Sequence, residues 1–217
     1  MYPYVIFDLD GTLLDTLEDL AIATNWVCQQ HGWPTHPVER FKEFVGNGAP
    51  KLLERITPAE VELTDDLHRQ TLDEFTNRYT NLEEDHTRPY PGMVELVKEL
   101  KKQGICTAIL TNKPHEAAYP IVNRYYPGLF QWVQGAVPEY PTKPDPTLLC
   151  RLMEQMGADP GRTLFVGDSN VDIQTAKNGN LTGCGVLWGF RSRQELEGEG
   201  ADFIVNSAEE LAELILH

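Results

Sequence analysis

Two aspartates separated by a single leucine come at the end of an apolar run near the beginning of the chain. They are Asp8 and Asp10, and the run at residues 4–9 has the β-branched and aromatic side chains typical of a strand. Since alternate side chains of a strand point to the same side, we expect the two carboxylates to lie together. Such a pair is tolerated when a cation neutralises it or when one carboxyl keeps its proton, and both conditions suit phosphoryl transfer. Ligands that are all oxygen atoms favour a hard ion such as Mg²⁺.

A second acidic cluster follows the apolar run at residues 163–166, in the sequence Gly-Asp-Ser-Asn-Val-Asp. Ligands of parallel sheets gather at the carboxyl ends of the strands, so Asp168 is a candidate metal ligand. Asp172 lies about one helical turn further on and could hold a metal-bound water. Ser169 and Asp172 also have the spacing of a helix capping box, so helix stability alone is an equally good explanation of Asp172.

Two further segments offer groups that could bind a phosphate. Thr111 and Asn112 follow the apolar run at residues 106–110, although the same residues before a proline are common in helix N-caps and turns. Lys143 lies in a proline-flanked loop, where its charge could offset Asp8 and a transferring phosphoryl group. A single lysine is more often a surface residue, and the prolines could serve only to start the next helix.

Apolar runs with the character of strands alternate with segments of helical periodicity, which predicts an α/β fold with a parallel sheet. The strands are expected at residues 4–9, 106–110, 132–137, 163–166, 183–188 and 203–205. The helices that alternate with the later strands are expected at residues 93–103, 115–125, 147–156, 171–178 and 208–216. Both acidic clusters would then lie at the carboxyl edge of the sheet.

The segment from residue 17 to residue 79 interrupts this alternation, because it has amphipathic helical periodicity and no convincing strand. A polar segment that contains Pro89 and Pro91 leads back to the sheet. We therefore predict a core domain of residues 1–15 and 88–217 and an inserted helical domain of residues 16–87. The acidic tripeptide at residues 83–85 is expected to be solvated surface.

The 217 residues carry a formal net charge of −15, which argues against binding to nucleic acid or to an anionic membrane through a basic surface. No stretch approaches the roughly 18 apolar residues of a membrane span, and the first residues do not resemble a signal peptide. The 4 cysteines are widely separated and form no zinc or dithiol motif. We therefore expect a cytoplasmic protein.

Four segments, taken in order along the chain, resemble the four motifs of the haloacid dehalogenase superfamily. They are Asp8-x-Asp10-Gly11-Thr12, Thr111, Lys143-Pro144 and Gly167-Asp168-x-x-x-Asp172. The resemblance spans the predicted core, implies a Rossmann-like parallel sheet, and makes the helical insert similar to a C1-type cap. Within the superfamily, three further segments and the start of the fourth motif resemble the sequences of phosphoglycolate phosphatases. The three segments are Val45-Gly46-Asn47-Gly48-Ala49, Tyr90-Pro91-Gly92 and Thr111-Asn112-Lys113-Pro114.

The resemblance implies that Asp8 attacks phosphorus and forms an aspartyl phosphate, while Asp10 protonates the leaving alkoxide and later activates water. It also implies that Mg²⁺ is held by the side chains of Asp8 and Asp168 and by the backbone carbonyl of Asp10. We place Asp172 in the same metal site, with the capping role described above as its alternative.

For the substrate, the resemblance implies that Thr111 and Lys143 bind the phosphoryl oxygens. Further substrate contacts are assigned to Gly11, Thr12, Asn112, Asn47 and Arg191. Of these, Asn47 lies in the insert, in a glycine segment that could equally be an ordinary turn between two helices. A carboxylate on the substrate would need a cation, and the candidates are Lys42, Lys51, Arg55 and Arg191.

The expected partner is a small phosphorylated metabolite, and the expected reaction is hydrolysis of 2-phosphoglycolate or a similar phosphate monoester. A phosphosugar mutase, a pyrophosphatase or a nucleotidase could use the same core, since contacts from the cap set the substrate. Asp10 argues against a dehalogenase, which lacks this residue and the magnesium site. The cap argues against a phospho-acceptor signalling module, which has no small ester to enclose. Monomer and dimer are both compatible with the sequence.

Overall fold

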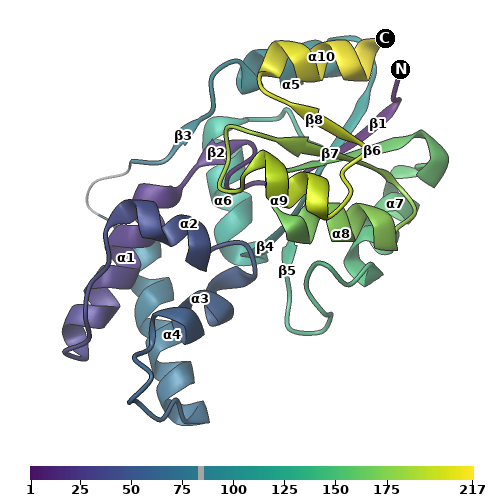
Figure 1. The fold of residues 1–217 in the computed structure, drawn as a ribbon. Coiled ribbons are helices and arrows are strands. Elements are labelled where there is room, and N and C mark those ends of the chain that lie inside the picture. Colours follow the sequence, from purple (N-terminus) through teal and green to yellow (C-terminus); the bar gives the residue numbers. More distant parts are fainter. Residues whose placement is uncertain (83–85) are drawn as a thin grey trace. The chain divides into compact units, whose positions relative to one another are not determined.

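The computed structural model describes residues 1–82 and 86–217, and the chain divides into two compact units (Figure 1). One unit, the core unit, consists of Met1–Asp15 and Arg88–His217. The other, the helical unit, consists of Thr16–Thr87. Residues 83–85, which were expected at the surface because of their charge, lie outside the described residues.

The core unit is built on a six-stranded sheet in the order β5-β4-β1-β6-β7-β8, and all of its strand pairs are parallel. The strands are β1 (Tyr4–Phe7), β4 (Cys106–Pro114), β5 (Trp132–Ala136), β6 (Thr163–Gly167), β7 (Thr182–Val186) and β8 (Phe203–Val205). The predicted parallel α/β sheet is confirmed. Since β1 lies between β4 and β6, the order of the strands reverses there, and such a reversal is where ligands of parallel sheets bind.

The helices of the core unit cover both faces of this sheet (Figure 1). They are α5 (Met93–Lys102), α6 (His115–Tyr125), α7 (Thr147–Met156), α8 (Asn170–Asn178), α9 (Arg193–Gly198) and α10 (Ala208–Leu216). A 3₁₀ turn at Pro160–Arg162 precedes β6, and the two-residue strands β2 (Leu14–Asp15) and β3 (Arg88–Pro89) form a separate antiparallel pair. The prediction did not include α9, β2 or β3.

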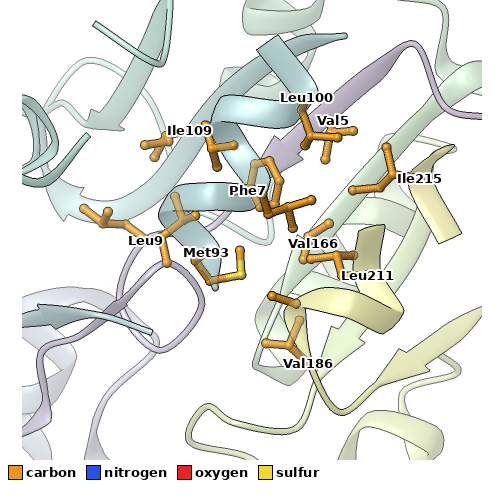
Figure 2. Close-up of a cluster of buried hydrophobic side chains, with 14 of the residues drawn as sticks. Val5, Phe7, Leu9, Met93, Leu100, Ile109, Val166, Val186, Leu211 and Ile215 are labelled. Carbon is orange, nitrogen blue, oxygen red and sulfur yellow. The ribbon is translucent and has the colours of Figure 1, made fainter. Parts of the chain in front are cut away.

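The alternation of side chains along β1 explains why its residues are apolar without interruption. Val5 and Phe7 pack into one hydrophobic cluster together with α5 and α10, as Figure 2 shows for Leu100 and Ile215. Ile6 points to the other face, where it packs with α7. A strand that is buried on both faces needs an apolar side chain at every position, and this holds β1 rigidly in the centre of the sheet.

The helical unit contains α1 (Leu17–Gln30), a 3₁₀ turn at Val38–Arg40, α2 (Phe41–Phe44), α3 (Gly48–Ile56) and α4 (Asp65–Thr80). Among its described residues there is no strand. Thr64 begins α4 as an N-cap whose hydroxyl oxygen accepts a hydrogen bond from Leu67 N. His31 Nε2 lies 2.7 Å from Glu74 Oε2 and so joins the end of α1 to α4.

One buried carboxylate holds the last residues of the helical unit against its first helix. Asp19, in the first turn of α1, accepts hydrogen bonds from His86 N at 2.9 Å, Thr87 N at 2.8 Å and Thr87 Oγ1 at 2.6 Å. These contacts join residues that are 67 and 68 positions apart in the sequence. None of the described helices in either unit combines the length and the apolar character that crossing a membrane requires.

Candidate active site

The ends of three neighbouring strands bring the chemically active residues of the core unit together. Phe7 at the end of β1 pairs with Ile109 of β4 on one side and with Val166 of β6 on the other. Asp8, Thr111 and Asp168, which the motifs singled out, come one or two residues after these three positions. The sheet continues for one step beyond β1, since Asp8 N donates a hydrogen bond to Val166 O at 2.8 Å.

Three buried carboxylates, two that follow the ends of β1 and β6 and one in α8, form one cluster. They belong to Asp8, Asp168 and Asp172, and each offers one oxygen that lies within 4.8 Å of the other two. Asp168 is 1% exposed and Asp172 is 0% exposed. Three negative charges this close inside a protein require positive charge nearby, because isolated buried ions are costly.

Lys143 supplies part of this positive charge. Its Nζ lies 2.9 Å from Asp8 Oδ1 and 2.7 Å from Asp172 Oδ1, and its side chain is 3% exposed. Asn112 fixes the backbone of Lys143. The Nδ2 of Asn112 donates to Lys143 O at 3.0 Å, and the Oδ1 of Asn112 accepts from Lys143 N at 2.8 Å. The amide of Asn112 therefore positions Lys143.

The two oxygens of Asp172 serve different partners. Oδ1 accepts a hydrogen bond from Lys143 Nζ, and Oδ2 accepts from the backbone N and the hydroxyl of Ser169 at 3.0 and 2.6 Å. The second set of contacts caps α8. Asp172 therefore caps α8 and also contacts the central lysine, while its expected place in the metal site stays a prediction. Gly167 makes room for it, because a Cβ there would lie 2.2 Å from Asp172 Cβ.

Asp168 is enclosed by backbone and by glycine. Its Oδ2 accepts a hydrogen bond from Phe190 N at 2.8 Å, and Thr12 Oγ1 lies 3.4 Å from its Oδ1. A Cβ on Gly11 would lie 2.4 Å from Asp168 Oδ2, and one on Gly189 would lie 2.2 Å from Asp168 Cβ. Glycine at both positions therefore lets the backbone approach this carboxyl closely.

Asp10 has a cation of its own, which the sequence analysis missed. Lys113 Nζ lies 3.2 Å from both Asp10 Oδ1 and Asp10 Oδ2. The strand β4 continues past the predicted end at residue 110 and carries Lys113 to this position. The signal was present in the sequence, because Lys113 is two residues beyond Thr111 and so falls on the same face of an extended chain.

Burial and mutual repulsion dominate the electrostatics of the cluster. Burial raises the pKa of Asp8 to about 7; Lys143 opposes this shift, and Asp172 adds to it. The pKa of Asp168 is also raised well above its ordinary value, mainly by burial and then by the charges of Asp172 and Asp8. For Lys143, burial lowers the pKa, but Asp172 and Asp8 outweigh it and raise the pKa above its ordinary value. The lysine therefore stays charged.

The cluster fits a hard divalent cation. All of its candidate ligand atoms are carboxylate oxygens, which Mg²⁺ prefers. Asp8 Oδ1 is buried, and its contact with Lys143 Nζ at 2.9 Å is an ion pair whose angles are not those of a hydrogen bond. A divalent cation would lower the raised pKa values of Asp8 and Asp168, since positive charge favours the ionised carboxylates.

The remaining predicted residues lie in three places. Thr111 is buried, and its Oγ1 accepts a hydrogen bond from Lys113 N at 3.2 Å. Arg191 follows Phe190, its Nε lies 3.8 Å from Glu195 Oε1, and its charge lowers the pKa of Asp168. Asn47 belongs to the helical unit, where its Oδ1 accepts a hydrogen bond from Arg55 Nη2 at 2.7 Å.

Known proteins with related sequences and structures include several that are named phosphoglycolate phosphatases. Residues 5–186 match the family described as haloacid dehalogenase-like hydrolase. The phosphoglycolate phosphatase of Pseudomonas putida is 34% identical over 93% of this chain and 75% of its own length. That of Vibrio parahaemolyticus is 33% identical over 97% of this chain and 95% of its own length.

A solved structure of similar fold is the crystal structure of a predicted phosphoglycolate phosphatase from Haemophilus somnus. It is 29% identical, covers 98% of this chain and 97% of its own, and superposes with a TM-score of 0.89. The predicted family, the Rossmann-like α/β fold and the class of enzyme, a phosphatase, are confirmed by these comparisons. This chain belongs to the haloacid dehalogenase-like hydrolase family.

Proposed function

We propose that this chain is a magnesium-dependent phosphatase that hydrolyses small phosphate monoesters through an aspartyl phosphate on Asp8. The observation that carries the proposal is the contact between Asp8 Oδ1 and Lys143 Nζ at 2.9 Å, beside two further buried carboxylates. A carboxylate next to a fixed cation can act as a nucleophile towards a phosphoryl group whose charge the same cation stabilises.

In the first half of the reaction, a carboxylate oxygen of Asp8 attacks phosphorus and the bond between phosphorus and the ester oxygen breaks. Asp10 gives its proton to that oxygen, so that the alcohol leaves uncharged. Lys143 and the hydroxyl of Thr111 bind the phosphoryl oxygens and hold the group in line for attack.

In the second half, Asp10 has become a carboxylate and accepts a proton from a water molecule. The water oxygen attacks phosphorus, the bond between Asp8 and phosphorus breaks, and inorganic phosphate is released. Asp10 is protonated again and Asp8 is a free carboxylate, so the site is ready for another turnover. One acid thus serves both halves of the reaction.

Phosphatases of this family generally use a metal ion, and the oxygen ligands here favour Mg²⁺. Asp8, Asp168 and the backbone carbonyl of Asp10 would hold it, and Asp172 would act through Lys143 or a bound water. When bound, the ion supplies charge that neutralises the phosphoryl oxygens. Asp172 Oδ1 accepts a hydrogen bond from Lys143 and so helps to position it, and Asp172 Oδ2 caps the first turn of α8.

The substrate that we propose is 2-phosphoglycolate or a similar small phosphate ester. The proposal is supported by relatives named as phosphoglycolate phosphatases, which are about a third identical over almost the whole chain. We also propose that the helical unit is a cap that contributes specificity, with Asn47 among its substrate contacts, and that the enzyme acts in the cytoplasm.

The test is phosphate release from a panel of small phosphate esters, with Mg²⁺ and with a chelator. We expect 2-phosphoglycolate to have the highest kcat/KM, and chelation or Asp8→Asn to abolish release while the circular dichroism spectrum is kept. Mass spectrometry after rapid acid quench should find a phosphorylated peptide that contains Asp8. Full activity of Asp8→Asn would refute the mechanism, and formation of an isomeric phosphosugar instead of inorganic phosphate would identify a mutase.

A further inference from the structure

Lys113 is a buried cation to which the proposed mechanism gives no task. Its side chain is 4% exposed, whereas that of its partner Asp10 is 21% exposed. Most lysine side chains remain in water, because burying the ammonium group is costly unless it gains a partner. Asp10 is such a partner, and since it is the proposed acid, Lys113 also lies where it can contact the substrate.

The backbone of Lys113 is held firmly where β4 ends. Its N–H donates to Thr111 Oγ1, and its carbonyl oxygen packs closely on β5, since a Cβ on Gly135 would lie 2.7 Å from it. The Lys113 side chain that starts from this backbone is 4% exposed, so the packing around it limits the positions of its Nζ. The ammonium group is therefore held at the edge of the site where Asp10 lies.

The two buried lysines of the site differ in their distances from the carboxylates that they contact. Lys143 lies 2.9 and 2.7 Å from carboxylate oxygens of two residues, which is the usual range for charge-assisted hydrogen bonds. Lys113 lies 3.2 Å from both oxygens of one carboxylate, which is longer than that range. An ammonium group has three donors, so the Nζ of a lysine can contact more than one acceptor at the same time.

The position of that second anion follows from the task of Asp10. If Asp10 protonates the leaving oxygen, the atoms bonded to that oxygen must lie beside the Asp10 carboxyl group and therefore beside Lys113 Nζ. In glycolate a single methylene separates the leaving oxygen from the carboxylate. Arg191 is a poorer candidate within the core unit, because its charge acts on the carboxyl group of Asp168.

We propose that Lys113 binds the carboxylate of the leaving group and so selects phosphate esters whose alcohol carries an acid group next to the ester carbon. The proposal rests on the proposed phosphatase function and deepens it, since it assigns the specificity for this class of substrate to a residue of the core unit.

The experiment compares two esters that differ only at the group in question, 2-phosphoglycolate and ethyl phosphate, in which a methyl group replaces the carboxylate. The variants are Lys113→Met, which removes the charge at similar length, and Lys113→Arg, which keeps it. Lys102→Met is the matched control, since Lys102 is an exposed lysine of α5 that lies 3.5 Å from Glu99. The readout is the ratio of kcat/KM for the two esters.

We expect the wild type to prefer the ester with the carboxylate, and Lys113→Met to reduce this ratio about 10- to 100-fold, the usual effect of losing a hydrogen bond to a charged group. Both esters will also lose some activity because Asp10 loses its neighbour. Lys113→Arg should restore part of the ratio, and Lys102→Met should leave it unchanged. Glycolate, as a product inhibitor, should bind more weakly to Lys113→Met by a similar factor.

An equal loss for both esters in Lys113→Met would overturn the proposal, because Lys113 would then act only through Asp10. An unchanged ratio with full activity would overturn it as well. If Lys113→Met does not fold, Lys113→Gln keeps a donor for Asp10 and provides the same comparison. Failure of the proposed function is a separate result, since the wild type would then release phosphate from neither ester.

Discussion

The backbone of Gly11 lies so close to the carboxyl group of Asp168 that a Cβ on residue 11 would stand 2.4 Å from Asp168 Oδ2. Two atoms that are not bonded to each other cannot lie so close, so either the backbone of residue 11 or the carboxyl group of Asp168 would have to move. Gly11 also has a φ of +85°, which residues with a side chain rarely adopt. The glycine that follows the two aspartates is thus explained by the position of an acidic residue 157 positions further along the chain.

Gly11→Ala should therefore lower both Mg²⁺ affinity and kcat/KM, the latter by about 100-fold or more, because a small displacement of a catalytic group has effects of this size. Gly104→Ala is the control, since Gly104 has a φ of +75° with no atom within 4 Å of the added Cβ. Both substitutions should lower the free energy of unfolding by about 1–3 kcal/mol through backbone strain. Equal activities of the two variants would show that the contact with Asp168 is unimportant.

Asp172→Ala should destabilise the protein by about 3–5 kcal/mol, because it removes a helix cap and one partner of a buried lysine together. Glu195→Ala tests a capping box that involves no buried lysine, since Glu195 Oε2 accepts from Ser192 N and Oγ at the exposed start of α9. That variant should lose only about 0.5–2 kcal/mol. Urea unfolding in the presence of a chelator measures both. Similar losses would mean that the contact with Lys143 adds little stability.

The convergence of Asp8, Asp168 and Lys143 was predictable because local features carry it. Each aspartate directly follows a run of apolar residues, and parallel strands place such positions at one edge of the sheet. The expected end of β4 at residue 110 was wrong, because Thr111 and Asn112 have side chains typical of turns. Asn112 continues the strand since its amide is satisfied by the backbone of Lys143, a partner 31 residues away that no local pattern contains.

The elements that were not predicted are short or depend on distant partners. β2 and β3 have two residues each and exist because Leu14 pairs with Pro89 and Asp15 with Arg88. A run of two residues carries no periodicity from which a strand could be inferred. The ion pair between Asp10 and Lys113 was missed for a related reason, since it depends on the extra length of β4.

Without metal, the free energy of unfolding should fall as the pH rises from about 4 to about 7. The pKa of Asp8 is raised from 3.8 to about 7 in the folded protein, so the folded form binds more protons than the unfolded form in this window. Urea unfolding at several pH values in a chelator should show this fall, and Asp8→Asn should reduce it. Mg²⁺ affinity, measured by calorimetry, should rise over the same window because binding displaces protons. An affinity that is independent of pH would contradict this.

Lys143→Ala should lower kcat/KM by an amount equivalent to about 2–4 kcal/mol of transition-state stabilisation, as is typical for removing one preorganised electrostatic group. The lysine contacts Asp8 directly, so the loss should appear in kcat rather than in KM alone. Lys102→Ala, which removes an exposed lysine of α5, should leave kcat/KM unchanged. A change of less than tenfold for Lys143→Ala would place this lysine outside the chemistry.

In the helical unit, Asp19→Ala should release the segment that contains His86 and Thr87. The carboxylate of Asp19 is buried and accepts three hydrogen bonds from these two residues, so its removal leaves two backbone N–H groups and one hydroxyl without this acceptor. We expect a loss of about 1–3 kcal/mol in the free energy of unfolding and faster hydrogen exchange of the amides of residues 86 and 87.

Glu18→Ala is the control, since Glu18 is an exposed neighbour that lies 3.6 Å from His86 Nδ1, and its removal should change stability by no more than about 0.5 kcal/mol. Unchanged exchange at both amides in Asp19→Ala would mean that other contacts hold this segment in place.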